Sequence, residues 1–179
     1  PAATMTAMAS CAALADCVAL LGLAQQQLAA GLTGFEAMNA FSLSLVAKHM
    51  RQLRQPLLSS ASAPWTVLLE LSDNESEAHA RDRFEGVLGQ ALERGIIGDA
   101  AVAESVAQSH TMWHLRESIP LAQAEEGLNI KHDIALPVSR IPAFCAEAEA
   151  ALSRAAPGMR LVNFGHLGDG NLHYNLQAP

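Results

Sequence analysis

The most informative segment of the sequence is FGHLGDGNLHYNL, residues Phe164–Leu176, close to the C-terminal end. Apolar residues alternate on both sides of Asp169-Gly170, a dipeptide typical of the type I′ turn because both of its central residues need positive φ. We therefore predict a β-hairpin in which these are the two loop residues. Counting outward from that turn places His166 directly opposite His173 on the two strands.

The predicted register separates a polar face of the hairpin from an apolar face. Directly opposed residues have Cβ atoms about 4.5–5.5 Å apart and point the same way, which suits two imidazoles binding one metal ion. Leu167 and Leu172 point to the other face and can enter a core. A solvated hairpin tip without a ligand remains an alternative. A glycine-rich phosphate site is disfavoured because no lysine follows in the P-loop position.

The composition is that of one globular domain. Half of the 179 residues are hydrophobic, which is enough for a packed core. The formal net charge is −7, no basic residues cluster, and only 4% of the residues are aromatic. A nucleic-acid surface and a polybasic membrane patch are therefore disfavoured. An anionic substrate would have to bind to a few well-placed cations.

The three cysteines, Cys11, Cys17 and Cys145, match neither a zinc-site spacing nor an even disulfide set. We expect buried free thiols in a reducing cytoplasm. The apolar run from Met8 to Leu23 contains Asp16 and is shorter than a membrane span usually is. The first residue is proline and both ends look cut from a longer polypeptide, so we expect a fragment.

Hydrophobic periodicity and turn residues predict alternating helices and strands. Helices are expected at residues 4–29, 40–54, 75–94, 106–125 (with a break at Pro120) and 139–158, strands at 32–39, 65–71, 100–105 and 129–137, a loop between Pro56 and Trp65, and the hairpin at 160–176. Such alternation fits a parallel α/β sheet or an antiparallel α+β sheet. The glycine-rich turn and continuous Val/Ile strands of a doubly wound fold are missing from the sequence, which favours α+β.

The string GHLGDGNLH within the hairpin also resembles a family signature. It is similar to that of the C-terminal domain of FAD-linked oxidases and dehydrogenases of the vanillyl-alcohol-oxidase type. The nearest branch contains D-2-hydroxyglutarate dehydrogenase, D-lactate dehydrogenase and the glycolate oxidase flavin subunit. The resemblance implies a ferredoxin-like antiparallel sheet with helices packed on one face. It also implies that residues 1–179 are a substrate- and metal-binding domain, with FAD bound mainly by another domain that this fragment does not contain.

The resemblance implies a metal site on the hairpin. In that family the two histidines, here His166 and His173, bind a divalent metal together with a glutamate from a downstream Glu-His-Gly segment. Zinc or manganese suits such imidazole and carboxylate ligands, as do iron and cobalt. The sequence ends at Pro179 before any such glutamate, so we expect an incomplete metal site.

The resemblance also implies residues that bind a substrate carboxylate. Arg116 and Lys131 match the family frame R-E-x-I…K-x-D-x-x-x-P, in which both cations contact carboxylate oxygens, and Asn175 matches an asparagine near the substrate. The alternative is that both cations are ordinary surface residues paired with nearby acids. Glu36 matches a further family position, to which we assign no role.

The function implied is oxidation of a D-2-hydroxy acid of the 2-hydroxyglutarate, lactate or glycolate type, with hydride transfer to FAD. The implied partners are the small acid and a separate electron acceptor, which could associate the enzyme with a membrane. A homo-oligomer is also allowed. The alternative from another class is a non-catalytic α+β ligand-binding or interaction module with a structural hairpin. The two hypotheses differ in the position of Arg116. The enzyme hypothesis requires Arg116 to lie close enough to the histidines for one small acid to contact both.

Overall fold

The computed structural model describes residues 1–56 and 63–179. One eight-stranded sheet runs through the molecule in the order β4-β1-β3-β2-β7-β8-β5, and β6 also pairs with β8. Every pairing is antiparallel, which confirms the α+β class. The loop predicted between Pro56 and Trp65 lies mostly outside the described residues.

The elements follow most of the predicted ranges. The strands are β1 (Ala3–Cys11), β2 (Leu32–Asn39), β3 (Trp65–Asp73), β4 (Asp99–Val102), β5 (Asn129–Ile130), β6 (Asp133–Ala135), β7 (Arg160–His166) and β8 (Asn171–Gln177). The α-helices are α1 (Leu14–Leu28), α2 (Ala40–His49), α3 (Glu77–Glu93), α4 (Val106–Glu117), α5 (Ile119–Glu126) and α6 (Ile141–Ala155). As expected from Pro120, the predicted helix over 106–125 divides into α4 and α5.

The first element contradicts the prediction of one helix over residues 4–29. Residues 3–11 form β1, which pairs with β3 on one side and β4 on the other. Both faces of this strand are covered, so its apolar residues do not alternate with exposed polar ones. The alanine-rich composition therefore resembled a helix, although the helix α1 begins only at Leu14.

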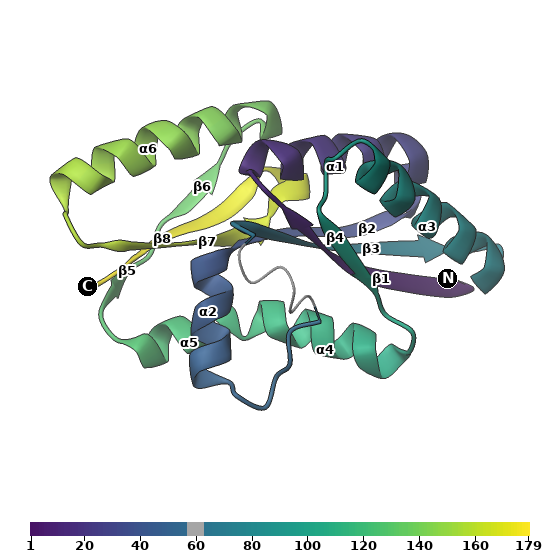
Figure 1. Cartoon of the computed structure of the whole chain (residues 1–179), viewed down its shortest axis with the longest axis horizontal. Helices are drawn as coiled ribbons and strands as arrows, with labels where there is room; N and C mark the ends of the chain where they lie inside the picture. Colours follow the sequence, from purple (N-terminus) through teal and green to yellow (C-terminus); the bar gives the residue numbers. More distant parts are fainter. Residues whose placement is uncertain (57–62) are drawn as a thin grey trace.

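Helices cover both faces of the sheet rather than one (Figure 1). The helices α1, α3 and α6 lie on one side, and α2, α4 and α5 lie on the other. Each side has its own buried cluster: Val67, Leu69 and Leu71 of β3 belong to the first, and Leu68 to the second. The expectation of a single helical layer is thus wrong, because the central strands are apolar on both faces.

The predicted strand over 129–137 is interrupted at Lys131 and His132. The backbone N–H of His132 donates to Oδ1 of Asn175 at 3.0 Å, and the carbonyl oxygen of His132 accepts from the N–H of Tyr174 at 2.7 Å. A side chain thus replaces a backbone partner at this point. The interruption divides the strand into β5 and β6 and leaves Lys131 between them, with an exposed side chain.

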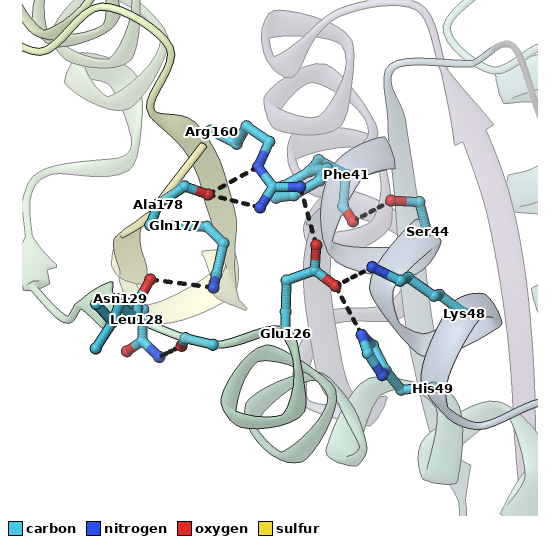
Figure 2. Close-up of polar contacts among 11 residues, drawn as sticks. Phe41, Ser44, Lys48, His49, Glu126, Leu128, Asn129, Arg160, Gln177 and Ala178 are labelled. Carbon is cyan, nitrogen blue, oxygen red and sulfur yellow. Dashed lines mark hydrogen bonds and ion pairs between the residues drawn. The ribbon is translucent and has the colours of Figure 1, made fainter.

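The end of α5 is fixed by a buried carboxylate (Figure 2). One oxygen of Glu126 accepts from Nζ of Lys48 at 2.6 Å and contacts Nε2 of His49 at 2.7 Å, and the other accepts from Nη1 of Arg160 at 2.9 Å. These contacts join α5 to α2 and β7. The hydrogen bond from Lys48, followed by those from His49 and Arg160, lowers the pKa of Glu126 to about 2.

We expect this cluster to make stability depend on acid pH. Because folding lowers the pKa of Glu126 from 4.5 to about 2, its stabilising contribution is complete above pH 4.5 and disappears as the pH falls toward 2. In Glu126→Gln that part of the pH dependence should be absent, whereas Glu125→Gln, an exposed neighbour, should behave like the parent. Urea unfolding at several pH values checks this. Parallel curves for the parent and Glu126→Gln would contradict it.

No helix among residues 1–56 and 63–179 combines the length and the hydropathy that a membrane crossing needs. The three cysteines are buried free thiols, as expected. Burial raises the pKa of the Cys145 thiol, and a thiol kept protonated reacts slowly.

Candidate functional site

Arg116 projects from α4 onto the sheet as a nearly buried cation. It is 8% exposed, and its Nε donates to Oε2 of Glu36 at 2.7 Å. Glu36 comes from β2 and is 1% exposed. The guanidinium carbon of Arg116 also lies 5.0 Å from the centroid of the Phe164 ring. A buried charge pair of this kind is stable only while both members are present.

The carboxylate of Glu36 also contacts the hairpin. His166 ends β7 directly opposite Glu36 of β2, and its Nδ1 contacts the second carboxylate oxygen, Oε1. Glu36 therefore joins Arg116 and His166, which places the arginine well within the span of a small acid from that histidine. This is the arrangement that separates the two functional hypotheses drawn from the sequence.

The hairpin has a different turn from the one predicted. Leu167–Asp169 form a 3₁₀ turn, and of the two predicted loop residues only Gly170 has a positive φ, 72°. Phe164, and not His166, is therefore opposite His173. The predicted register is wrong by two residues. An even shift keeps each residue on its face, so the two histidines become diagonal neighbours, a relation that spans about 7–8 Å between strands.

The apolar half of the hairpin prediction is confirmed. Leu167 and Leu172 are both buried in the core cluster beneath α1 and α6. The hairpin is therefore held from below by apolar contacts while His166 and His173 remain on the opposite face.

A second group of side chains surrounds a cavity of about 220 Å³. Nδ1 of His173 lies 2.6 Å from Oδ1 of Asp133, and its ring lies 4.7 Å from that of Phe164, centroid to centroid. Lys131 is exposed at the cavity wall and has no partner among the described residues. The complete lining is Pro120, Gln123, Lys131, Asp133, Phe164, His173 and Asn175.

Asn175 is held rigidly within this lining. It is 3% exposed, its Oδ1 accepts from the backbone N–H of His132, and its Nδ2 donates to Oε1 of Gln123 at 3.0 Å. Three of the predicted residues, Lys131, His173 and Asn175, thus line one cavity. The other two, Arg116 and His166, meet on Glu36, and the Phe164 ring contacts members of both groups. Their roles toward a substrate stay predictions.

The two histidines fit the donor set of a metal site in part. Each has its Nδ1 on a carboxylate, Glu36 for His166 and Asp133 for His173, and this second contact commonly orients a metal-binding imidazole whose Nε2 is the ligand. Yet within the described ranges no three His, Cys, Asp or Glu side chains gather around a common point. The described residues therefore offer two candidate imidazoles and no third ligand beside them, and the metal site stays a prediction.

Sequence reasoning missed four contributors to this region: Glu36, Gln123, Asp133 and Phe164. A single acid in the apolar strand LTGFEAMN was a usable signal for Glu36, since an unpaired buried carboxylate is costly and its cation had to be sought elsewhere. Nothing in the sequence indicated that Arg116 was that cation, because the two are 80 residues apart.

Comparison with known proteins identifies the family of the chain. The family model described as FAD linked oxidases, C-terminal domain, matches residues 1–179. D-2-hydroxyglutarate dehydrogenase, mitochondrial, of Arabidopsis thaliana is 32% identical over 172 residues, covering 96% of this chain and 30% of the relative. Its namesake of Rattus norvegicus is 33% identical over 178 residues, covering 99% of this chain and 32% of the relative. The chain therefore spans about a third of these relatives.

Solved structures share the fold at low sequence identity. A structure of p-cresol methylhydroxylase with substrate bound superposes with a TM-score of 0.67 at 9% identity, covering 98% of this chain and 38% of the other. One of alkyldihydroxyacetonephosphate synthase gives 0.63 at 11% identity, covering 98% and 36%. At such identities the likeness concerns the fold alone.

Proposed function

The chain belongs to the family of C-terminal domains of FAD-linked oxidases, and from this premise we propose that it forms the substrate-binding part of a flavin-dependent D-2-hydroxy-acid dehydrogenase. The product would be the 2-oxo acid. The observation that carries the proposal is the convergence of Arg116 and His166 on Glu36, beside the cavity lined by Lys131, His173 and Asn175. The names of the curated relatives support an acid of the 2-hydroxyglutarate type.

Two cations would bind the substrate carboxylate. Arg116 uses Nε for Glu36, which leaves its two terminal nitrogens for the paired oxygens of a carboxylate. Lys131, unpaired among the described residues, would add an ammonium group from the cavity wall. The buried pair with Glu36 keeps the arginine in one orientation, so little side-chain freedom would be lost on binding.

Two further groups would complete the enzyme. FAD, bound mainly by residues outside this chain, would accept the hydride. A divalent metal such as zinc or manganese, bound by Nε2 of His166 and His173 with a ligand from outside the chain, would act as a Lewis acid on the substrate hydroxyl. Glu36 and Asp133 would hold the two imidazoles in the tautomer that presents Nε2.

The electron acceptor and the cellular compartment are proposed on the same basis. A dehydrogenase of this kind needs a separate electron acceptor. The buried thiols suit a reducing compartment such as the cytoplasm, and mitochondrial is part of the names of the plant and rat relatives. Homo-oligomerisation stays a prediction.

The test is turnover by the full-length flavin-bound protein. D-2-hydroxyglutarate, D-lactate and glycolate would each be mixed with the enzyme while flavin bleaching is recorded. We expect at least one D-acid to reduce the flavin and its L-enantiomer not to. In Lys131→Met, losing a charge-assisted contact should raise KM roughly 10- to 100-fold, whereas Arg154→Met on α6, away from the cavity lining, should not. Failure of every D-acid would favour the non-catalytic module.

Metal binding is tested separately by calorimetric titration of zinc and manganese. We expect the parent chain to bind weakly, because only two protein ligands are present, and His173→Ala to bind at least tenfold more weakly. His110→Ala, on α4 and outside the site, is the control. Equal binding by the parent and His173→Ala would contradict the assignment of that histidine.

A further inference from the structure

Gln123 is the least expected residue of the 220 Å³ cavity. It comes from α5, is 0% exposed, and lines the cavity together with Lys131 and Asn175. Its side-chain nitrogen Nε2 has no hydrogen-bond partner among the residues that the structure describes. A buried donor without an acceptor is unfavourable, so such a group calls for an explanation.

A chain of hydrogen bonds fixes which end of the Gln123 amide is left unpaired. The backbone N–H of His132 can only donate, so the atom of Asn175 that it contacts must be the oxygen Oδ1. Asn175 then has to present Nδ2 to Gln123, and the atom that receives it must be Oε1. The two N–H groups of Gln123 are thereby kept as donors. Reversing either amide would break this sequence of contacts.

The side chain of Lys131, beside Gln123, indicates the chemical class of the ligand. Lys131 lines the same cavity, carries a positive charge and lacks a partner within the described residues. Pro120 and Phe164 supply apolar walls. The ammonium group of Lys131 and the amide of Gln123 would each add one hydrogen bond to the carboxylate proposed for Arg116, whose two oxygens can accept about four in all. A phosphate would require more donors than these two residues offer.

We infer that Gln123 is a further substrate-binding residue, whose side-chain N–H groups donate to a carboxylate oxygen of the acid that Lys131 also binds. The inference rests on the proposed function and adds to it a residue that the sequence analysis did not indicate. Asn175 and the backbone of His132 act as positioning groups for this amide. The site thus distinguishes an acid from its ester or amide, which lacks a charged second oxygen.

Two substitutions at this position test the inference in the full-length flavin-bound protein. Gln123→Met keeps the size but removes both donors, so KM for the D-2-hydroxy acid should rise roughly 10- to 100-fold with little change in kcat. Gln123→Glu still accepts from Asn175 but turns a carboxylate toward the substrate. Its KM should be higher still, and should fall as the pH is lowered toward the pKa of the new carboxyl, a pH dependence that lost packing would not produce.

Gln177→Met is the matched control. Gln177 is also 0% exposed and also has an unpaired side-chain atom, but it lies at the end of β8 outside the cavity lining. We expect its KM to equal that of the parent. A Gln123→Met enzyme with the parent's KM, or one no more impaired than Gln177→Met, would overturn the inference.

The failure of this inference can be told from the failure of the proposed function. If the parent oxidises a D-2-hydroxy acid and Gln123→Met has an unchanged KM, only the inference is wrong. If the parent oxidises none, calorimetry with D-2-hydroxyglutarate decides: tighter binding by the parent than by Gln123→Met supports the inference. Equal or undetectable binding by both overturns it.

Discussion

Replacing Glu36 with leucine is expected to lower the free energy of unfolding by about 3–5 kcal/mol, the usual cost of leaving one member of a buried ion pair without its partner. The side chain of Arg116 is 10% exposed and that of Glu36 is 2% exposed, so neither charge can recover its hydration when the other is removed. His166 is mostly exposed at the surface and can be hydrated, so most of the cost should come from the arginine.

The pair is best measured as a double-mutant cycle. Arg116→Met should also destabilise the chain, because it leaves Glu36 with the histidine alone. In the double variant both charges are gone and an apolar contact can replace them, so it should be less destabilised than the sum of the two single variants. Urea unfolding of the four proteins gives the coupling energy. Additive effects would show that the two side chains do not act as a pair.

Activity, measured with the same substitutions in the full-length flavin-bound protein, should follow a different order from stability. Arg116 is proposed to bind the substrate carboxylate, so the double variant should regain stability and yet stay at least roughly 100-fold lower in kcat/KM, as expected when contacts to a charged group are lost. A double variant that regains stability without regaining activity would show that Arg116 does more than neutralise Glu36.

Glu70→Leu is the control for this cycle. Glu70 lies half-buried on the neighbouring strand β3 and accepts from Nε1 of Trp113 at 2.7 Å and from the hydroxyl of Thr33 at 3.1 Å, both neutral donors. Its loss should cost only about 1–3 kcal/mol, the penalty for leaving neutral polar groups unpaired. A Glu70→Leu protein as unstable as Glu36→Leu would mean that burial of any acid on this sheet, and not the Arg116 pair, sets the effect.

The periodicity of the sequence predicted most elements because burial on one face leaves a readable pattern. The helix α3, in which Ala80, Phe84 and Val87 are buried at helical spacing, is of this kind. The strand WTVLLEL is buried on both faces and was found instead from its continuous run of strand-forming apolar residues. Periodicity failed for β1, where both faces are covered and the pattern is lost. The number of helical layers was missed for the same reason. Whether one face or two is buried depends on partners that a single strand does not specify.

The site could be predicted as a list of residues but not as an arrangement. Two diagonal histidines, an arginine and a lysine were all found from the resemblance to a family signature. Glu36, which joins two of them, stands on another strand and was assigned no role. Long-range pairing of single charges leaves no local trace in a sequence. The turn was misjudged because Asp169-Gly170 also suits a 3₁₀ turn that needs only one positive φ.

The second large loss of stability is expected from substitution of Gly170 in this turn. Gly170 has a φ of +72°, and a Cβ atom added to it would lie 2.1 Å from the backbone oxygen of Leu136. The same glycine accepts from the N–H of Leu136 at 3.0 Å, so the two backbones cannot separate without losing that hydrogen bond. In Gly170→Ala the strained φ alone costs about 1–3 kcal/mol, and relieving the overlap adds to it.

Gly168 provides a matched control two residues earlier in the same turn. A Cβ atom there would lie 3.6 Å from Cβ of Phe35, an ordinary contact, and no unusual φ is required. Gly168→Ala should therefore unfold within about 0.5 kcal/mol of the parent, as a tolerated substitution does. Urea unfolding of both variants checks the difference, and similar stabilities would show that β6 moves aside at little cost.

The consequence of Gly170→Ala should reach beyond stability. The turn joins the two strands that carry His166 and His173. Leu136, whose backbone would have to move, directly follows β6, and β6 carries the Asp133 that contacts His173. We expect Gly170→Ala to lose zinc or manganese affinity at least tenfold, as second-contact changes at metal sites do, and Gly168→Ala to retain it. If Gly170→Ala is unstable but binds metal as the parent does, the two histidines are positioned by the strands and not by the turn.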